Sequence, residues 1–518
     1  MKKKLIISIL ATTAALCGAI GFAACEDGDN ANNEPALVYE YRAEEDYWEI
    51  TGIGTVTDNE IVIPSTFEGK PVGSIGRNVF ASPKLTSVTI PDSIINIGEG
   101  AFSGCSGLTV ITIPGSVKYI GEKAFDGSGL TAITIPDSVT TIGKYAFNAC
   151  EGLTSATIGK GVTSISEGMF ESCSNLTSVT LPDKLTSIGD RVFENCNKLN
   201  NITIPEKVTS IGFLAFGSCK KLTSITVPDS VTDMANSVFS ACESLTSVTL
   251  SQNITAIGDD AFWHCGSLTE IVIPDKVTSI GRTAFLDCNS LKEITIGNGV
   301  KTIDDSAFTG CGNIESVAMP VSAISNIINL TRSTIKTVEV TSGDAIGEYA
   351  FSNCTNLTKI ILPNTITSIG NNAFSECTSL TKITIPQGVS VIGEYAFANC
   401  DSMQYNEYDN ALYLGNSVNP YMILVKAANK EITSCNINEK TKFIHSGAFD
   451  NCSKLIEMSI PESVTSFGIY MLNECRALTD VNYSGTKEQW KAIEKHEHWD
   501  EQTLNFAIHC SDGDLTRI

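Results

Sequence analysis

Hydrophobic and polar residues follow one pattern that repeats through most of this chain. Its clearest copy is FENCNKLNNITIPEKVTSIGFLAF, residues 193–216. The alternating Ile-Thr-Ile part predicts a short strand, which proline ends because it has no N–H to donate. The Val-x-x-Ile-Gly part predicts a second short extended piece and a bend. The Ala-Phe-x-x-Cys part predicts a single helical turn that places phenylalanine inside the protein.

The phenylalanines measure the period of the repeat. Most successive anchors lie 22 or 23 residues apart, but 43 residues separate Phe308 from Phe351 and 52 residues precede Phe449. The irregular coil after Phe308 still predicts a strand at residues 335–340. The sixteen anchors are Phe80, Phe102, Phe125, Phe147, Phe170, Phe193, Phe216, Phe239, Phe262, Phe285, Phe308, Phe351, Phe374, Phe397, Phe449 and Leu472. Such a period is typical of a solenoid, in which each coil covers the apolar side of its neighbour.

The pattern also predicts how the chain is divided. An end coil would expose its apolar side, so both ends of the solenoid need caps. The C-terminal cap is expected to contain a helix from about Lys487 to Lys495 and a terminal strand. The predicted regions are a capping hairpin with a first repeat (37–80), regular repeats (81–400), a hairpin-like insertion (401–447), the last repeats (448–482) and a C-terminal cap (483–518).

The N-terminus has the layout of a secretory signal. Residues 1–24 combine a basic start, an apolar run and an exit of small residues. The segment Phe22-Ala23-Ala24-Cys25 resembles a bacterial lipobox, whose cysteine receives diacylglycerol and becomes the new N-terminus. We expect lipidation at Cys25, and the alternative is a plain signal peptide cut near Ala24. Residues 25–36 would then form an acidic tether, so the protein is expected to be exported and anchored to the membrane at the cell surface.

Charge limits the choice of partners. The formal net charge is −23, and loss of Lys2, Lys3 and Lys4 with the signal peptide makes it −26. A phosphate backbone needs a basic surface, so nucleic acid is excluded as a partner. Beyond the signal peptide, no segment approaches the roughly 18 continuous apolar residues of a membrane span. Membrane contact is therefore expected only through the lipid anchor.

Cysteines form the most conspicuous chemical pattern. A disulfide between neighbours in one column would strain the torsion that the bond requires, and Ser128 replaces one member without any change in a partner. We therefore expect buried free thiols, with disulfides or metal binding as the alternatives. Cys435 and Cys510, outside the column, could pair with each other or stay unpaired. The column, three residues after the anchors, comprises Cys105, Cys150, Cys173, Cys196, Cys219, Cys242, Cys265, Cys288, Cys311, Cys354, Cys377, Cys400, Cys452 and Cys475.

Outward strand positions give the candidate binding face. Most carry Ser or Thr, as at Ser155 and Thr157, which fits a solvated strand. Ordering of ice-like water by a flat threonine array is the alternative. Charged residues interrupt this array at Glu270, Glu293, Glu339, Lys359 and Lys382. We expect this charged part of the face to make specific contacts with a protein.

Metal and nucleophilic chemistry have little support. The chain has five histidines and lacks the G-x-S-x-G, H-E-x-x-H and P-loop patterns. His496, His498 and Asp500 could supply metal ligands, but histidines two residues apart on a helix do not share a face. We interpret these three residues as surface polar groups, and we predict no cofactor, no metal site and no catalytic residue.

One region remains open to an enzymatic interpretation. A hydrolase, if present, would have its site in the insertion at residues 401–447, because this region departs from the repeat. Its aromatic residues could line such a site or could equally pack within a hairpin. They are Tyr405, Tyr408, Tyr413 and Tyr421.

The unit C-x-x-L-x-x-I-x-I-P-x-x-V-x-x-I-G-x-x-A-F resembles the repeat of the BspA-like leucine-rich-repeat family, from about residue 37 to 510. The resemblance implies a mainly-β, right-handed superhelix of about 16 coils of 22–23 residues, with short parallel strands and helical turns. Members of this family serve as surface adhesins and as binders of host matrix proteins. We therefore expect a non-enzymatic surface lipoprotein that binds extracellular matrix or surface proteins, most naturally in adhesion. The alternatives are an exported hydrolase and a passive structural spacer.

Overall fold

A computed structural model describes residues 37–503 and 505–516 of the chain. The predicted signal peptide and the tether with Cys25 lie outside the described residues. The chain divides into two compact units, one of residues up to 290 with 306–310, the other of residues 291–305 with those from 311 onward. Both are stacks of coils, with about 20 turns in all. The predicted mainly-β solenoid is confirmed, and turns without a Phe or Leu anchor raise the number of coils above about 16.

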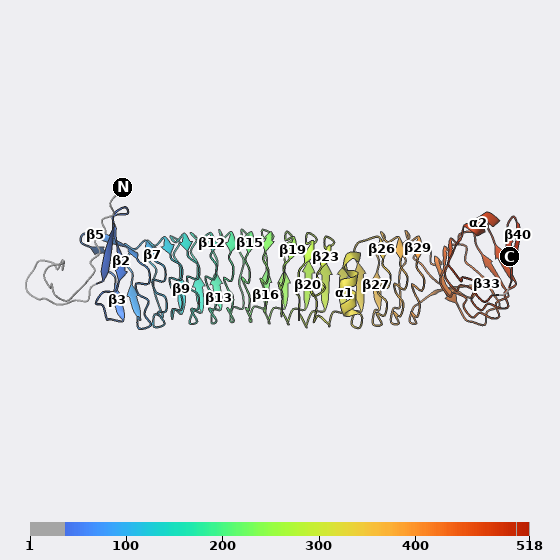
Figure 1. Cartoon of the computed structure of the whole chain (residues 1–518), viewed down its shortest axis with the longest axis horizontal. Helices are drawn as coiled ribbons and strands as arrows, with labels where there is room; N and C mark the ends of the chain where they lie inside the picture. The colour runs from blue at the N-terminus through green and yellow to red at the C-terminus, as the bar shows by residue number, and fades with distance from the viewer. Residues whose placement is uncertain (1–36, 504, 517–518) are drawn as a thin grey trace, which may run out of the picture. The chain divides into compact units, whose positions relative to one another are not determined.

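Two rows of short strands lie on opposite sides of the first unit (Figure 1). Strands next to each other in a row are parallel and in register, as Ser155 with Ser178 and Thr157 with Thr180 show. Row A contains β3 (Glu60–Val62), β6 (Ser87–Thr89), β9 (Ala132–Thr134), β11 (Ser155–Thr157), β13 (Ser178–Thr180), β16 (Ser224–Thr226), β18 (Ser247–Thr249) and β20 (Glu270–Ile273). Row B contains β5 (Lys70–Ile75), β7 (Asn96–Ile97), β8 (Tyr119–Ile120), β10 (Thr141–Ile142), β12 (Ser164–Ile165), β14 (Ser187–Ile188), β15 (Ser210–Ile211), β17 (Asp233–Met234), β19 (Ala256–Ile257) and β21 (Ser279–Ile280).

Anchor phenylalanines form the centre of the core. They lie in the turns that lead from row B back to row A, and their rings stack from coil to coil. Ring centroids are 4.9 Å apart between Phe285 and Phe308 and 5.9 Å apart between Phe170 and Phe193. All of these side chains are buried. The aromatic column therefore joins each coil to its neighbours.

The turns that hold these phenylalanines differ from the predicted helical turn. The residues two before and two after the anchor lie in the left-handed region, with φ of 57° at Tyr145 and 51° at Ala149 around Phe147. Such residues interrupt a right-handed helix. The physical reason is the destination of the backbone hydrogen bonds. Tyr145, Phe147 and Ala149 donate their N–H groups to Glu167, Met169 and Glu171 of the next coil, not to their own turn.

Cysteines of the column complete the same turns. Each described member is buried and lies outside any disulfide, as the sequence predicts. Most of these thiols have a partner that the sequence did not reveal, the carbonyl of the anchor one coil earlier. Cys173 Sγ lies 3.1 Å from Phe147 O, and Cys196 Sγ lies 3.2 Å from Phe170 O. Burial raises the pKa of Cys242 to about 12, which keeps that thiol protonated.

An antiparallel hairpin covers the N-terminal end of the first unit. It consists of β1 (Val38–Arg42) and β2 (Tyr47–Gly52), and β2 continues row B by pairing in parallel with β5. Tyr39 stacks on Phe67 of β4 (Thr66–Phe67) at 4.1 Å, and Trp48 packs edge-on against the same ring at 5.1 Å. These aromatic side chains provide a small core of their own at the end of the unit.

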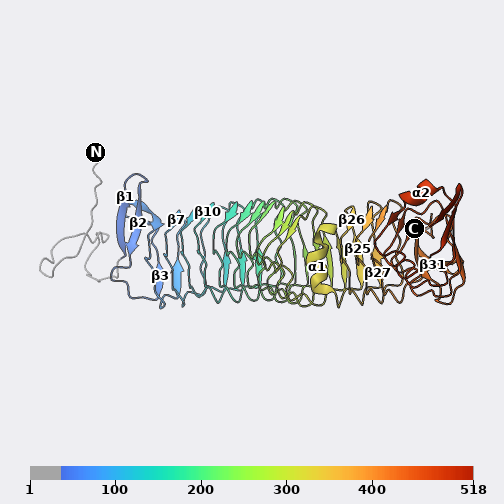
Figure 2. The same cartoon turned by 45° about the vertical axis from the view of Figure 1, so that its right-hand side comes forward.

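The second unit has the same two rows and one irregular coil. That coil contains η1 (Val321–Ala323) and α1 (Ile324–Thr331), shown in yellow in Figure 2. It then forms β25 (Thr337–Val340), where the sequence predicts a strand over residues 335–340. Row A here comprises β22 (Glu293–Ile296), β24 (Ser316–Met319), β25 and β27 (Lys359–Ile361). Row B comprises β23 (Thr302–Ile303), β26 (Ala345–Ile346), β28 (Ser368–Ile369) and β29 (Val391–Ile392).

Residues 401–516 add a hairpin, further coils and a closing element. The helix α2 (Lys487–Ala492) begins with a capping box of Thr486 and Gln489 and buries Trp490. One sheet contains β30 (Asn406–Tyr408), β31 (Ala411–Leu414), β32 (Ile423–Ala427), β34 (Phe443–Ile444), β36 (Ser466–Phe467) and β38 (Glu494–Lys495). The other contains β33 (Ser434–Asn436), β35 (Glu457–Ile460), β37 (Asp480–Tyr483), β39 (Ala507–Cys510) and β40 (Gly513–Thr516).

The order of this second sheet rules out a bond between Cys435 and Cys510. The two cysteines lie on β33 and β39, with β35 and β37 between these strands. Three strand spacings of about 4.8 Å far exceed the Cα separation of about 7 Å that a disulfide tolerates. Both residues are free thiols, and the suggestion that they pair is wrong.

A buried histidine joins the regular coils to the C-terminal region. In the preceding coil, Phe374 donates its N–H to the carbonyl of Ala396, 2.8 Å away. At the last regular coil, the N–H of Phe397 instead lies 3.3 Å from Nε2 of His445. Nδ1 of His445 lies 3.1 Å from Ser446 O, so this nitrogen carries the proton and Nε2 accepts. Burial lowers the pKa of His445 to about 4.

We predict that the contribution of the His445 contact to the stability of the protein is lost in acid. Because the pKa of His445 is lower in the folded than in the unfolded protein, its contribution to stability is complete above about pH 6.5 and is lost as the pH falls toward 4. The expected loss is on the order of 3 kcal/mol of unfolding free energy. The variant His445→Gln keeps one acceptor and one donor but cannot titrate, so urea unfolding should show a weaker acid dependence.

The variant His264→Gln serves as the control, because His264 is exposed and its Nε2 lies 3.6 Å from Asp287 Oδ2. It should keep the acid dependence of the wild type. If His445→Gln and the wild type lose the same stability between pH 7 and pH 4, the proposed role of His445 is contradicted.

Candidate functional site

The outward side chains of row A form two straight columns on each unit. In the first unit the columns carry Ser and Thr, because the register places Ser155 beside Ser178 and Thr157 beside Thr180. These positions are largely exposed. The result is a hydroxyl-rich surface with little charge on its strands.

A second set of threonines precedes row A and has a structural role. Thr154 Oγ1 donates to the carbonyl of Thr131 at 2.9 Å, and Thr177 Oγ1 donates to the carbonyl of Thr154 at 2.9 Å. The ladder continues as Thr246 bonds to Thr223 and Thr269 to Thr246. The recurrent Leu-Thr pair is the signal in the sequence that marks this ladder.

Four of the five predicted contact residues lie on the second unit, whereas Glu270 lies on β20 of the first. Their register is now defined. Glu293 begins one outward column, which continues through Ser316 and Thr337 to Lys359 and Lys382. Glu339 occupies the neighbouring column, between Ala318 and Ile361. All five predicted residues are exposed, as a contact surface requires.

Lys359 and Lys382 are direct neighbours across two coils. They form an isolated parallel bridge, and among the described residues neither ammonium has a carboxylate at ion-pair distance. Lys336, one coil earlier, differs because its Nζ lies 2.9 Å from Glu315 Oε2. Ile361, on the same strand as Lys359, is 42% exposed. Positive charge and an apolar side chain therefore lie together at this part of row A.

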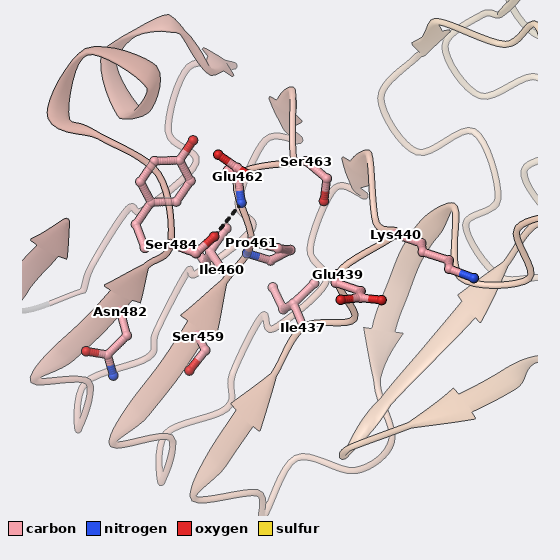
Figure 3. A pocket seen from close by; sticks show the side chains of 11 residues that line it. Ile437, Glu439, Lys440, Ser459, Ile460, Pro461, Glu462, Ser463, Asn482 and Ser484 are labelled. Carbon is pink, nitrogen blue, oxygen red and sulfur yellow. Dashed lines mark hydrogen bonds between the residues drawn. The ribbon is translucent and has the colours of Figure 1, made fainter. Parts of the chain in front are cut away.

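An open groove crosses the ends of three strands of one sheet in the C-terminal region (Figure 3). It has a volume of about 810 Å³ and lies where β33, β35 and β37 end. Ile437, Ile460 and Tyr483 are its buried lining residues. The exposed rim includes Glu439, Lys440, Glu462, Asn482 and Ser484.

The polar groups of the groove do not form a catalytic arrangement. Glu462 is held by the next coil and by α2, because its N–H donates to Ser484 Oγ at 2.8 Å and Gln489 Nε2 donates to its Oε2 at 3.4 Å. The hydroxyl of Tyr483 is shielded from water and has no hydrogen-bond partner among residues 37–503 and 505–516. No nucleophile in this lining has a paired general base, which acyl transfer would require.

The tyrosines of the insertion pack within its hairpin. Tyr413 is completely buried on β31, where its ring meets Tyr421 edge-on at 5.5 Å. Tyr408 lies 5.6 Å from the same Tyr421 ring. Tyr405 is half-buried, and Lys426 Nζ lies over its ring at 5.1 Å. Three of the four tyrosines thus form one packed cluster, as the packing interpretation predicts.

The two histidines considered as metal ligands are engaged separately. His496 Nδ1 lies 3.2 Å from Glu394 Oε1, and His498 Nδ1 lies 3.4 Å from Glu501 Oε2. The two imidazoles therefore face different carboxylates. In the described part of the chain, no three His, Cys, Asp or Glu side chains are grouped as a metal ion would require.

The repeat itself decides the family. The sequence matches the family described as BspA type leucine rich repeat region over residues 73–200, 163–289, 255–343, 326–418 and 427–496. These matches cover most of the chain and coincide with the coils of both units. The chain belongs to the BspA-type leucine-rich-repeat family. The resemblance seen in the repeat unit is thereby confirmed.

Solved structures of several bacterial leucine-rich-repeat proteins are similar to this BspA-type chain. A protein from Bacteroides ovatus is 23% identical, with 90% of this chain and 98% of that chain covered and a TM-score of 0.41. A leucine-rich cell surface protein from Faecalibacterium prausnitzii is 26% identical, with the same coverage and a TM-score of 0.28. The pneumococcal vaccine antigen PcpA is 14% identical over 91% of this chain and 98% of its own, with a TM-score of 0.28.

No curated protein matches this BspA-type chain in sequence. Within the described residues, no helix has the length and apolar character that crossing a membrane would require.

Two tyrosines of the C-terminal region provide a test of whether the Tyr483 hydroxyl, at the groove, lacks a hydrogen-bond partner. Because the hydroxyl of Tyr483 is buried without a partner, Tyr483→Phe should leave the unfolding free energy unchanged or raise it by up to about 1 kcal/mol. Tyr413→Phe is the matched control, because its hydroxyl accepts from the N–H of Asn438 at 3.4 Å. This second variant should lose about 1 kcal/mol in urea unfolding. Equal losses in both variants would mean that the Tyr483 hydroxyl is paired.

Proposed function

We propose that this BspA-type protein is an exported surface lipoprotein that binds other proteins and acts in adhesion. A lipid on Cys25 would anchor it, and row A of the second unit would be its contact face. Three features support the proposal: the signal-like residues 1–24, the lipobox-like segment that ends at Cys25, and membership of a repeat family whose resemblance implies surface binding. The expected partners are extracellular matrix or surface proteins.

One observation carries the binding part of the proposal. Charged side chains from coils far apart in sequence are aligned on one exposed strand face, where Lys359 lies directly beside Lys382. Like charges in direct cross-strand contact destabilise a sheet, so folding alone does not favour this placement. A partner that carries the opposite charge would offset the repulsion.

The tether defines how far the body could lie from its anchor. Residues 26–36 connect Cys25 to the first described residue, and a chain of this length reaches at most about 40 Å. The two units would then be displayed beyond the lipid surface, where a protein of another cell or of the matrix could reach row A.

No specific observation supports the other two functions, an exported hydrolase and a passive spacer. A hydrolase in residues 401–447 would need accessible catalytic groups, but the insertion uses Tyr413 and Tyr421 for packing. A passive spacer would not need unpaired lysines on a strand face. We therefore propose the binding function and leave the hydrolase and the spacer as outcomes that the experiments distinguish.

Lipidation can be tested in cells. We expect the full chain to incorporate an alkyne-labelled fatty acid and to fractionate with membranes. Cys25→Ala should lose the label and appear in the medium, because a single signal sequence without an acyl chain provides no lasting membrane anchor. Cys510→Ala is the control, and it should label like the wild type. Labelling that persists in Cys25→Ala would contradict the proposed anchor.

Protein binding can be tested with residues 37–518 immobilised through their N-terminus. We expect saturable binding to at least one member of a panel of purified matrix and bacterial surface proteins. The charge-reversed variant Lys359→Glu/Lys382→Glu should weaken this binding by at least about tenfold, the equivalent of about 1.4 kcal/mol. Absence of saturable binding across the panel, together with no hydrolase activity, would favour the spacer.

A further inference from the structure

Lys359 and Lys382 are the beginning of a longer basic strip. The N–H of Gln404 donates to the carbonyl of Thr381 at 2.9 Å, so the following residue, Tyr405, takes the position next to Lys382 on the following coil. Lys426 Nζ lies 5.1 Å from the centroid of the Tyr405 ring. We call Lys359, Lys382 and Lys426, with Tyr405 between the last two, the lysine strip.

The strip is unusual in a chain of this charge. The whole sequence carries 58 acidic and 35 basic residues. On the coils of Lys359 and Lys382, however, the other outward strand positions hold Ile361 and Thr384, and the ladder positions before them hold Thr358 and Thr381, none of which is acidic. The nearest carboxylates lie at the two ends of the strip: Glu339 is the neighbour of Ile361 one coil earlier, and Asp401 acts on Tyr405. The strip is therefore a local positive region on a strongly negative protein.

The surroundings of the strip favour a protein segment as its ligand. Ile361 is 42% exposed beside Lys359, and Tyr405 is half-buried beside Lys382. These side chains offer apolar contact that a sulfated glycan or another purely polar polyanion would leave unused. An acidic peptide with apolar residues between its carboxylates would use both the charge and the apolar contacts.

The spacing favours a helical segment over an extended one. Neighbouring coils place Lys359 and Lys382 about 4.8 Å apart at their backbones. Residues at i and i+4 of a helix are about 5–6 Å apart, whereas alternate residues of an extended strand are about 6.6 Å apart. Carboxylates on one face of a helix that runs along the coil axis would therefore meet successive lysines.

We propose that the lysine strip binds an acidic amphipathic helix of a partner protein. This inference rests on the proposed protein-binding function and adds the chemistry of the partner. Glutamates at i and i+4 of the helix pair with Lys359 and Lys382, and apolar residues of the same face contact Ile361 and Tyr405. Lys426 extends the positive region over Tyr405. Charge also steers the partner to this strip, because the rest of the protein repels an acidic segment.

A designed peptide tests the inference directly. The probe is a fluorescent alanine-based helix with glutamates at i and i+4 and leucines beside them, titrated against residues 37–518 at low and at physiological ionic strength. We expect saturable binding that weakens with salt. The variant Lys359→Gln/Lys382→Gln should bind the probe at least about tenfold more weakly. Its thermal unfolding midpoint should be unchanged or higher, because a like-charge contact is removed.

The control has the same net charge but an intact strip. Lys442→Gln/Lys454→Gln removes two exposed lysines elsewhere in the second unit, of which Lys454 pairs with Glu431. It should bind the probe within about twofold of the wild type. Equal weakening in both double variants would overturn the inference, because binding would then depend on net charge. Absence of binding by the wild type, or tighter binding of a sulfated hexasaccharide than of the peptide, would also overturn it.

The experiments distinguish a failure of this inference from a failure of the proposed protein-binding function. Capture of a matrix or surface protein that Lys359→Gln/Lys382→Gln retains would uphold the binding function and overturn the acidic helix as the partner. If the peptide binds but no protein of the panel is captured, the lysine strip is supported as a site for an acidic helix. Adhesion to the proteins of the panel is then contradicted.

Discussion

Every coil of this protein depends on hydrogen bonds to the next coil. In the anchor turn, alternate residues such as Tyr145, Phe147 and Ala149 send their N–H groups forward by one coil. The left-handed residues on both sides of the anchor make this possible, because they turn the backbone donors away from their own segment. Stacked phenylalanine rings and the thiol-to-carbonyl bonds of the cysteine column occupy the space inside. A coil alone would leave these donors, carbonyls and rings in water, so coils are stable only in a stack.

The same constraint shapes the surface. Because the register is fixed, a residue at a given place in one repeat lies beside its counterpart in the next, about 4.8 Å away. Single substitutions spaced 22 or 23 residues apart thus become neighbours, as Lys359 and Lys382 do. The core positions hardly vary, whereas outward positions can change from hydroxyl to charge without any cost in packing. A binding surface can therefore arise on this scaffold without a cavity.

Much of the fold could be predicted from the sequence, because the same pattern of buried and exposed positions recurs in each repeat. The anchors, buried cysteines and strand-ending prolines all have their predicted places. The prediction of a helical turn was wrong because an Ala-Phe-x-x-Cys segment does not reveal that its N–H groups donate to the next coil. The helix α1 had a readable signal, since Ile324, Ile327, Ile328 and Thr331 follow a helical period and are all buried.

Other features depend on contacts that no local pattern contains. His445 lies 48 residues from Phe397 and replaces a backbone carbonyl as the acceptor of its N–H. Lys426 reaches Tyr405 only because the insertion folds back as a hairpin. For the contact face, the sequence identified the charged positions but not their register, so it could not show that Glu339 lies in a different column from Glu293 and Lys359.

The dependence of each coil on its neighbours can be measured most directly by hydrogen exchange in the variant Phe216→Ala. The account predicts that amide protection falls in the coils of Phe193 and Phe239 as well as in the altered coil, and recovers with distance along the stack. Loss of protection confined to the altered coil would contradict the account, because each coil would then be stable without its neighbours.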